Sequence, residues 1–107
     1  MNDPQYVEAA RLLAERMVRE GGADPAARIG WGFRAVTARA PRPPEAASLR
    51  ALYDAELAEY RRDRRRALRF LRVGARPRDP ALDPAEVAAL AVVANTLLNL
   101  DEAVTKR

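Results

Sequence analysis

The chain has 107 residues, 49% of them hydrophobic, and a formal net charge of +4 from 19 basic and 15 acidic side chains. It contains no Cys and no His, which excludes disulfides, Cys or His zinc sites, thiolate nucleophiles, haem-attachment motifs and imidazole bases. This length supports one small core. Because 23 residues are Ala, which favours helix but fills little volume, we predict an all-α bundle with a thin core.

Asp-Pro pairs at positions 3–4, 24–25 and 83–84 indicate helix starts. Asp accepts hydrogen bonds from the free amides of a first turn, where Pro fits because no N–H is needed. No segment alternates with period two for long enough to predict a strand. We therefore predict about five helices in a single domain or fragment, over residues 4–20, 25–39, 44–62, 64–73 and 84–105.

The first two expected helices carry short apolar stripes. Ala10, Ala14 and Met17 share one face of the first helix, which should stop at the Gly pair at positions 21–22. In the second helix, Gly30 and Gly32 are unfavourable for helix formation. We expect both glycines to allow close approach of a neighbouring helix.

Prolines 41, 43 and 44 separate the second helix from the third. The fourth, short helix begins after Asp63 and should close at Gly74. Residues 75–83 contain two prolines and are expected to form a surface loop.

The last expected helix is the most apolar part of the chain. Asp83 should cap it, Glu86 can close a capping box, and Leu82 and Val87 occupy the positions of a hydrophobic staple. Such a helix must be covered by others. Its expected buried face contains Leu90, Val93, Leu97, Leu100 and Val104.

The strongest charge feature is a run of eight arginines within residues 61–76: Arg61, Arg62, Arg64, Arg65, Arg66, Arg69, Arg72 and Arg76. On a helix, Arg65, Arg69 and Arg72 align, and Arg76 would extend the line if the helix continued. Such a line could follow a phosphate backbone, with affinity that falls steeply as salt rises. The ordinary alternative is a solvated helix face, because nearby acids neutralise part of the charge.

Three polar side chains fall where they could meet other helices. Glu56 lies inside the apolar stripe of the third helix, where an acid needs an Arg or Tyr hydroxyl partner. Asn95 and Asn99 lie one turn apart on the last helix. We interpret all three as polar packing or interaction positions. The alternative is an active-site acid for Glu56 and a ligand cleft for Asn95 and Asn99. Trp31 is interpreted as a core or interface anchor.

Three stretches, residues 2–11, 33–39 and 83–102, occur in an order that resembles a known family. They are similar to the C-terminal end of a domain of unknown function in large planctomycete proteins of the cytochrome C and PSD types. The resemblance implies an incomplete domain that closes a multidomain, exported or periplasmic parent protein. Any haem would belong to a separate module. Arg42 and the arginines at 64–66 depart from the family pattern, so the arginine run is a local elaboration.

The leading functional hypothesis is a non-catalytic helical module, without cofactor or metal, that serves as a scaffold or docking surface. Its partner would be the remainder of the parent protein or a second copy, and we expect an exposed apolar patch or self-association. The alternative is a small basic nucleic-acid-binding protein that uses residues 61–76. No bilayer-spanning segment is expected, since the final apolar run is interrupted by polar residues from Asn95 onward. No signal peptide is expected either, since no apolar stretch follows a basic start at the N-terminus.

Overall fold

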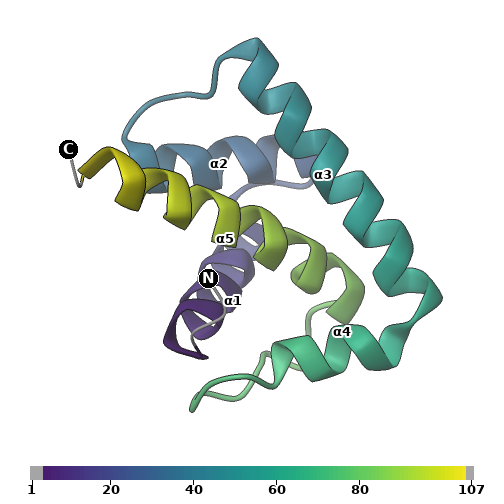
Figure 1. The fold of residues 1–107 in the computed structure, drawn as a ribbon. Helices are drawn as coiled ribbons and strands as arrows, with labels where there is room; N and C mark the ends of the chain where they lie inside the picture. Colours follow the sequence, from purple (N-terminus) through teal and green to yellow (C-terminus); the bar gives the residue numbers. More distant parts are fainter. Residues whose placement is uncertain (1–3, 106–107) are drawn as a thin grey trace.

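The computed structural model describes the backbone of residues 4–105 and the side chains of residues 5–100 (Figure 1). Over this range it contains five helices and no strand, which confirms the all-α fold. The expected helix bounds agree with the structure to within two residues. The helices are α1 (Pro4–Glu20), α2 (Pro25–Thr37), α3 (Pro43–Arg62), α4 (Arg64–Leu71) and α5 (Pro84–Thr105).

Three of the Asp residues that were expected to cap helices do so, and the fourth, Asp3, lies outside the described residues. Asp24 and Asp63 each accept a hydrogen bond from the backbone N–H three residues further on, at 2.9 and 3.1 Å. Asp83 accepts one from the N–H two residues further on, at 3.2 Å. These bonds satisfy amides that have no partner within the helix.

Glu86, which was expected to close a capping box, forms ion pairs with two other helices. Its carboxylate lies 3.2 Å from the Arg28 guanidinium and 3.6 Å from that of Arg61. Arg28 belongs to α2 and Arg61 to α3, so Glu86 ties the beginning of α5 to both neighbouring helices.

The end of α2 also differs from the expectation. Ala38 adopts a left-handed conformation with φ 63°, and its N–H binds the Arg34 carbonyl oxygen at 2.9 Å. The Thr37 hydroxyl donates to the Phe33 carbonyl oxygen at 2.7 Å. The helix therefore ends two residues before Arg39, with the left-handed cap that commonly terminates helices.

Helix α5 is the central element of the fold, in contact with each of the other four helices (Figure 1). Leu90, Val93 and Leu97 are fully buried, as predicted, and so are alanines on its other faces. The small alanine side chains let neighbouring helices lie close on all sides. Leu100 departs from the predicted buried face because it is 43% exposed, and the Val104 side chain lies outside the described residues.

The two glycines of α2 are not equivalent. A Cβ atom on Gly32 would lie 2.7 Å from the buried Met17 side chain, so this glycine does allow the close approach of α1. A Cβ on Gly30 would meet no atom within 4 Å. The expectation of close approach is thus confirmed at Gly32 and wrong at Gly30.

Candidate anion-binding surface

A buried ion pair links α1 to residues 72–83, the α4–α5 segment. Arg11 is 1% exposed and Glu15 4% exposed, and the two side chains meet at 3.2 Å. Arg11 also donates hydrogen bonds to the carbonyl oxygens of Arg76 and Pro77. A buried charge is tolerated when it is paired and hydrogen-bonded, and Arg11 meets both conditions.

Acidic side chains of α1 bind N–H groups of the same segment. Glu15 accepts a hydrogen bond from the Asp79 N–H at 2.9 Å, and Glu8 accepts one from the Arg76 N–H at 2.6 Å. The Ala81 N–H and the Arg19 guanidinium hold the pKa of Asp79 below its ordinary value. The segment lacks regular secondary structure, yet α1 satisfies several of its backbone polar groups.

The sequence did not predict these contacts of Glu8, Arg11 and Glu15 with the α4–α5 segment, which together form the charged clamp. Arg11 and Glu15 flank the apolar positions Ala10 and Ala14, which is where an amphipathic helix changes from its buried to its solvated face. The one available signal was the spacing of Glu8, Arg11 and Glu15, which puts three charges on one side of the helix.

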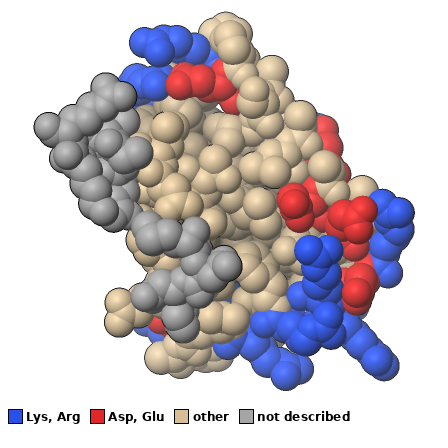
Figure 2. Space-filling view, viewed as in Figure 1, with Lys and Arg blue, Asp and Glu red and all other residues tan. Residues whose placement is uncertain are grey.

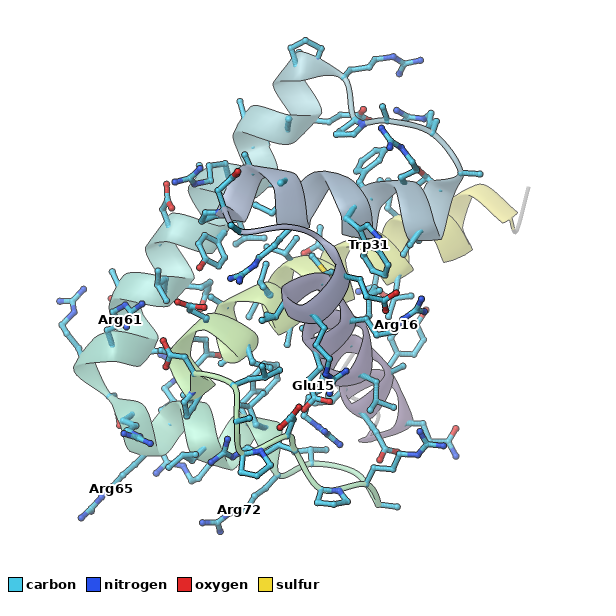
Figure 3. All side chains as sticks on the ribbon, turned by 180° about the vertical axis from the view of Figure 1, so that it is seen from behind. Glu15, Arg16, Trp31, Arg61, Arg65 and Arg72 are labelled. Carbon is cyan, nitrogen blue, oxygen red and sulfur yellow. The ribbon has the colours of Figure 1, made fainter. Side chains whose placement is uncertain are left out.

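We define the arginine surface as five exposed side chains of α4 and the segment that follows it: Arg64, Arg65, Arg69, Arg72 and Arg76. Within the described residues, no ion pair joins any of them to a carboxylate. Basic side chains gather at the α4 end of the molecule in Figure 2. Arg65 and Arg72 extend away from the body of the protein in Figure 3.

The other arginines of the run have partners. Arg61 lies 3.4 Å from Asp83, and Arg62 lies 2.8 Å from Glu59. The Arg66 guanidinium lies over the Tyr60 ring, 5.4 Å from its centroid. The run thus divides into paired members near α3 and the unpaired members of the arginine surface.

Helix α4 ends at Leu71, so Arg76 does not continue the helical line of Arg65, Arg69 and Arg72. Instead, Arg76 and Arg72 both line an open cavity of about 560 Å³. The half-buried Arg78 is a third arginine in the lining, and the remaining lining residues include Leu68, Pro77 and Pro80. The clamp on α1 fixes the backbone that carries Arg76.

A second cavity, of about 210 Å³, brings together two of the three predicted polar positions. Glu56 of α3 and Asn95 of α5 both line it, whereas Asn99 lies outside it. Tyr60 also lines the cavity, and burial raises the pKa of its phenol, with the Glu56 carboxylate adding to the rise and Arg66 opposing it. The interpretation of Glu56 and Asn95 as contact positions between helices stays a prediction, now with a defined location.

Trp31 is half-buried against the core, and the Arg16 guanidinium lies 5.1 Å from its ring centroid (Figure 3). This contact joins α1 to α2. Its position fits the interpretation of Trp31 as an anchor between elements.

The apolar faces of α1 and α5 pack against each other. The expected apolar patch is small: among the described side chains, Leu100 is the only large hydrophobic one that is exposed. It borders a groove of about 370 Å³ that Phe33, Leu49 and Leu97 also line.

The described residues contain no group of three or more acidic, Cys or His side chains arranged to hold a metal ion. None of the five helices, over the range that the structure describes, has the length and apolar character needed to cross a membrane.

Comparisons with family models, curated proteins and solved structures find no match to this chain. The resemblance to the planctomycete domain therefore stays a prediction.

Proposed function

We propose that the chain is a non-catalytic helical interaction module that binds an anionic partner through the arginine surface. The observation that supports this proposal is that five exposed arginines without an ion pair, among the described residues, gather on α4 and the segment after it; Arg34, Arg42, Arg66 and Arg78 also form no ion pair there. In the part of the chain that the structure describes, eight arginines lie within 3.7 Å of a carboxylate, namely Arg11, Arg16, Arg19, Arg28, Arg39, Arg50, Arg61 and Arg62. The arginine surface has no such compensation among the described residues.

Unpaired arginines produce a local positive potential that attracts anions without first breaking an internal ion pair. The guanidinium group also presents several donors in a planar fork that matches carboxylate and phosphate oxygens. The partner therefore needs several negative charges in a row. An acidic segment of a larger parent protein would meet this need.

Nucleic acid is the second candidate partner. Arg65 and Arg69 are separated by one helical turn, about 6 Å of rise, and Arg72 follows by about 4.5 Å more. A row with this spacing can contact successive phosphates of one strand. Arg76 extends the positive surface beyond the end of the helix.

Binding of two labelled probes, a DNA duplex and a polyglutamate peptide, tests both candidates by fluorescence anisotropy at low salt. Substitution of Arg65, Arg69, Arg72 and Arg76 by Gln should weaken binding by at least about tenfold and reduce its salt dependence. A matched control replaces four exposed arginines on other surfaces by Gln, namely Arg16, Arg34, Arg42 and Arg50. This control variant lowers the net charge by the same amount as the arginine-surface variant.

Preference for the peptide supports a protein partner, and preference for the duplex supports nucleic acid. If the arginine-surface variant and the control variant lose the same amount of binding affinity, net charge rather than the arginine surface drives binding. Failure of both probes to bind at low salt would overturn the proposal.

A further inference from the structure

The cavity between α1, α3, α4 and α5 has features of a small-molecule site that are separate from the arginine surface. Its volume is about 210 Å³. A cavity of about 150 Å³ is enough to hold benzene, so by the same ratio this one accommodates roughly eight or nine non-hydrogen atoms. Cavities between the helices of a bundle are common ligand sites when a few polar groups converge on an apolar lining.

Three polar side chains reach this cavity from three different helices. They are Glu56 of α3, Arg66 of α4 and Asn95 of α5. Glu56 is half-buried, and within the described part of the chain its carboxylate forms no ion pair. The Arg66 guanidinium lies over the Tyr60 ring. The cavity is therefore lined by one negative group, the Glu56 carboxylate, and one positive group, the Arg66 guanidinium, which do not form an ion pair with each other.

Asn95 is the least satisfied polar group of the cavity. Its amide oxygen is buried and has no hydrogen-bond partner among the described residues. A buried polar atom without a partner costs about 1–3 kcal/mol, which makes such atoms uncommon in native proteins. A half-turn of the amide exchanges its oxygen and nitrogen, so the side chain can present an acceptor or a donor to a ligand in the cavity.

The rest of the lining is apolar and aromatic. Tyr60 and Phe70 stack with parallel rings, 6.1 Å between centroids, and both line the cavity. Val7 and Val92 complete an apolar wall. A ligand that fits must combine a hydrocarbon group with charged groups of both signs.

We propose that this cavity binds a small zwitterion with an apolar side chain, that is, an apolar α-amino acid. Its ammonium group binds the Glu56 carboxylate and the Asn95 amide oxygen, and its carboxylate binds the Arg66 guanidinium. The side chain packs against Phe70 and Val92. Leucine, with nine non-hydrogen atoms, is the size that the cavity volume indicates.

Titration of the ¹⁵N-labelled full chain with three related compounds tests the proposal. Leucine carries both charges, 3-methylbutylamine lacks the carboxylate, and 4-methylpentanoate lacks the ammonium group. We expect leucine to shift the backbone amide signals of Glu56, Arg66 and Asn95 saturably. Each analogue should bind at least about tenfold more weakly, because it leaves a charged group of the site without its partner.

Variants assign the two charged contacts. Glu56→Gln should abolish the preference for leucine over 4-methylpentanoate, and Arg66→Gln should abolish its preference over 3-methylbutylamine. Glu59→Gln and Arg65→Gln are matched controls on the same helices, because both residues are exposed and lie outside the cavity. They should leave leucine binding unchanged.

Two results would overturn the proposal. One is the absence of any shift around the cavity with leucine, which would leave ordered water as its occupant. The other is a set of non-saturating shifts equal for the three compounds, which would show adventitious association only. Neither result affects the arginine surface, since polyanion binding is measured separately with variants of other residues.

Discussion

Arg11 and Glu15 lie one turn apart on α1 and bind opposite kinds of backbone group in the α4–α5 segment. Arg11 donates to two carbonyl oxygens of the segment, Glu15 accepts from the Asp79 N–H, and the two side chains pair with each other at 3.2 Å. The buried ion pair thus supplies partners to an irregular stretch of backbone, while the Arg11 Nε stays buried without a hydrogen-bond partner among the described residues. This arrangement makes the conformation of the segment depend on α1.

Substitution of Arg11 by Met should lower the free energy of unfolding by about 3–5 kcal/mol. The change leaves the buried Glu15 with the more distant Arg19 guanidinium, 3.6 Å away, and removes the donors for the carbonyl oxygens of Arg76 and Pro77. Urea denaturation followed by circular dichroism measures the loss. Replacing Glu15 by Leu in addition should not restore stability, because the Asp79 N–H would then also lack its partner.

Arg50→Met is the matched control for this prediction. Arg50 and Asp54 are also four residues apart on one helix, at 3.0 Å, but both are exposed. Exposed pairs contribute about 0.2–1 kcal/mol. Equal losses for the Arg50 and Arg11 variants would show that the buried pair does not support the segment.

Gly74→Ala should loosen the α4–α5 segment from α1. Gly74 has φ +108°, which disfavours any residue with a side chain, and an added Cβ would lie 2.6 Å from the Glu8 side chain. Displacement of Glu8 removes the acceptor of the Arg76 N–H. Hydrogen exchange should therefore become faster at the amide of Arg76, and an unchanged rate there would contradict the proposed link.

The helices could be predicted because their signals are local. Asp24 and Asp63 each act on an amide three residues away, so the sequence around them contains the whole interaction. The core face of α5 was also predictable, since the separations of Leu90, Val93 and Leu97 follow the helical period. The error at Leu100 arose because periodicity assigns a face without saying where the covering helices end.

The charged clamp and the two cavities could not be predicted in the same way. Arg11 and Arg76 are separated by 65 positions, and their contact depends on how α1 and α4 pack against α5. Sequence reasoning identified Glu56 and Asn95 separately as unusual polar positions. That they line one cavity follows from the packing of α3 on α5, which no local pattern encodes.

The two glycines of α2 give opposite predictions for the same substitution. Gly30→Ala should raise the free energy of unfolding by about 0.5–1 kcal/mol, because Ala favours helix and the new methyl group meets no atom within 4 Å. Gly32→Ala should lower it by about 1 kcal/mol, since the methyl group would displace the buried Met17 side chain. Calorimetry of both variants measures the difference, and a stabilised Gly32 variant would show that Met17 relocates at little cost.

The stability of the fold in acid depends on Glu45 at the start of α3. The Arg39 guanidinium, 2.9 Å away, and the Arg42 N–H lower the pKa of Glu45 from its ordinary value of 4.5 to about 2. A carboxyl group with a lower pKa in the folded state stabilises the fold when it is ionised in both states. That contribution is complete above about pH 4.5 and declines as the pH falls toward 2.

Glu45→Gln isolates this contribution, because Gln can still accept a hydrogen bond from the Arg42 N–H but carries no charge. The difference in unfolding free energy between the original chain and the variant should be constant near neutral pH and shrink between pH 4.5 and pH 2. Arg39→Gln removes the largest cause of the low pKa, so in that background the same difference should already be small at neutral pH. If the difference in unfolding free energy does not change with pH in either background, Glu45 acts through its shape and hydrogen bonding rather than its charge.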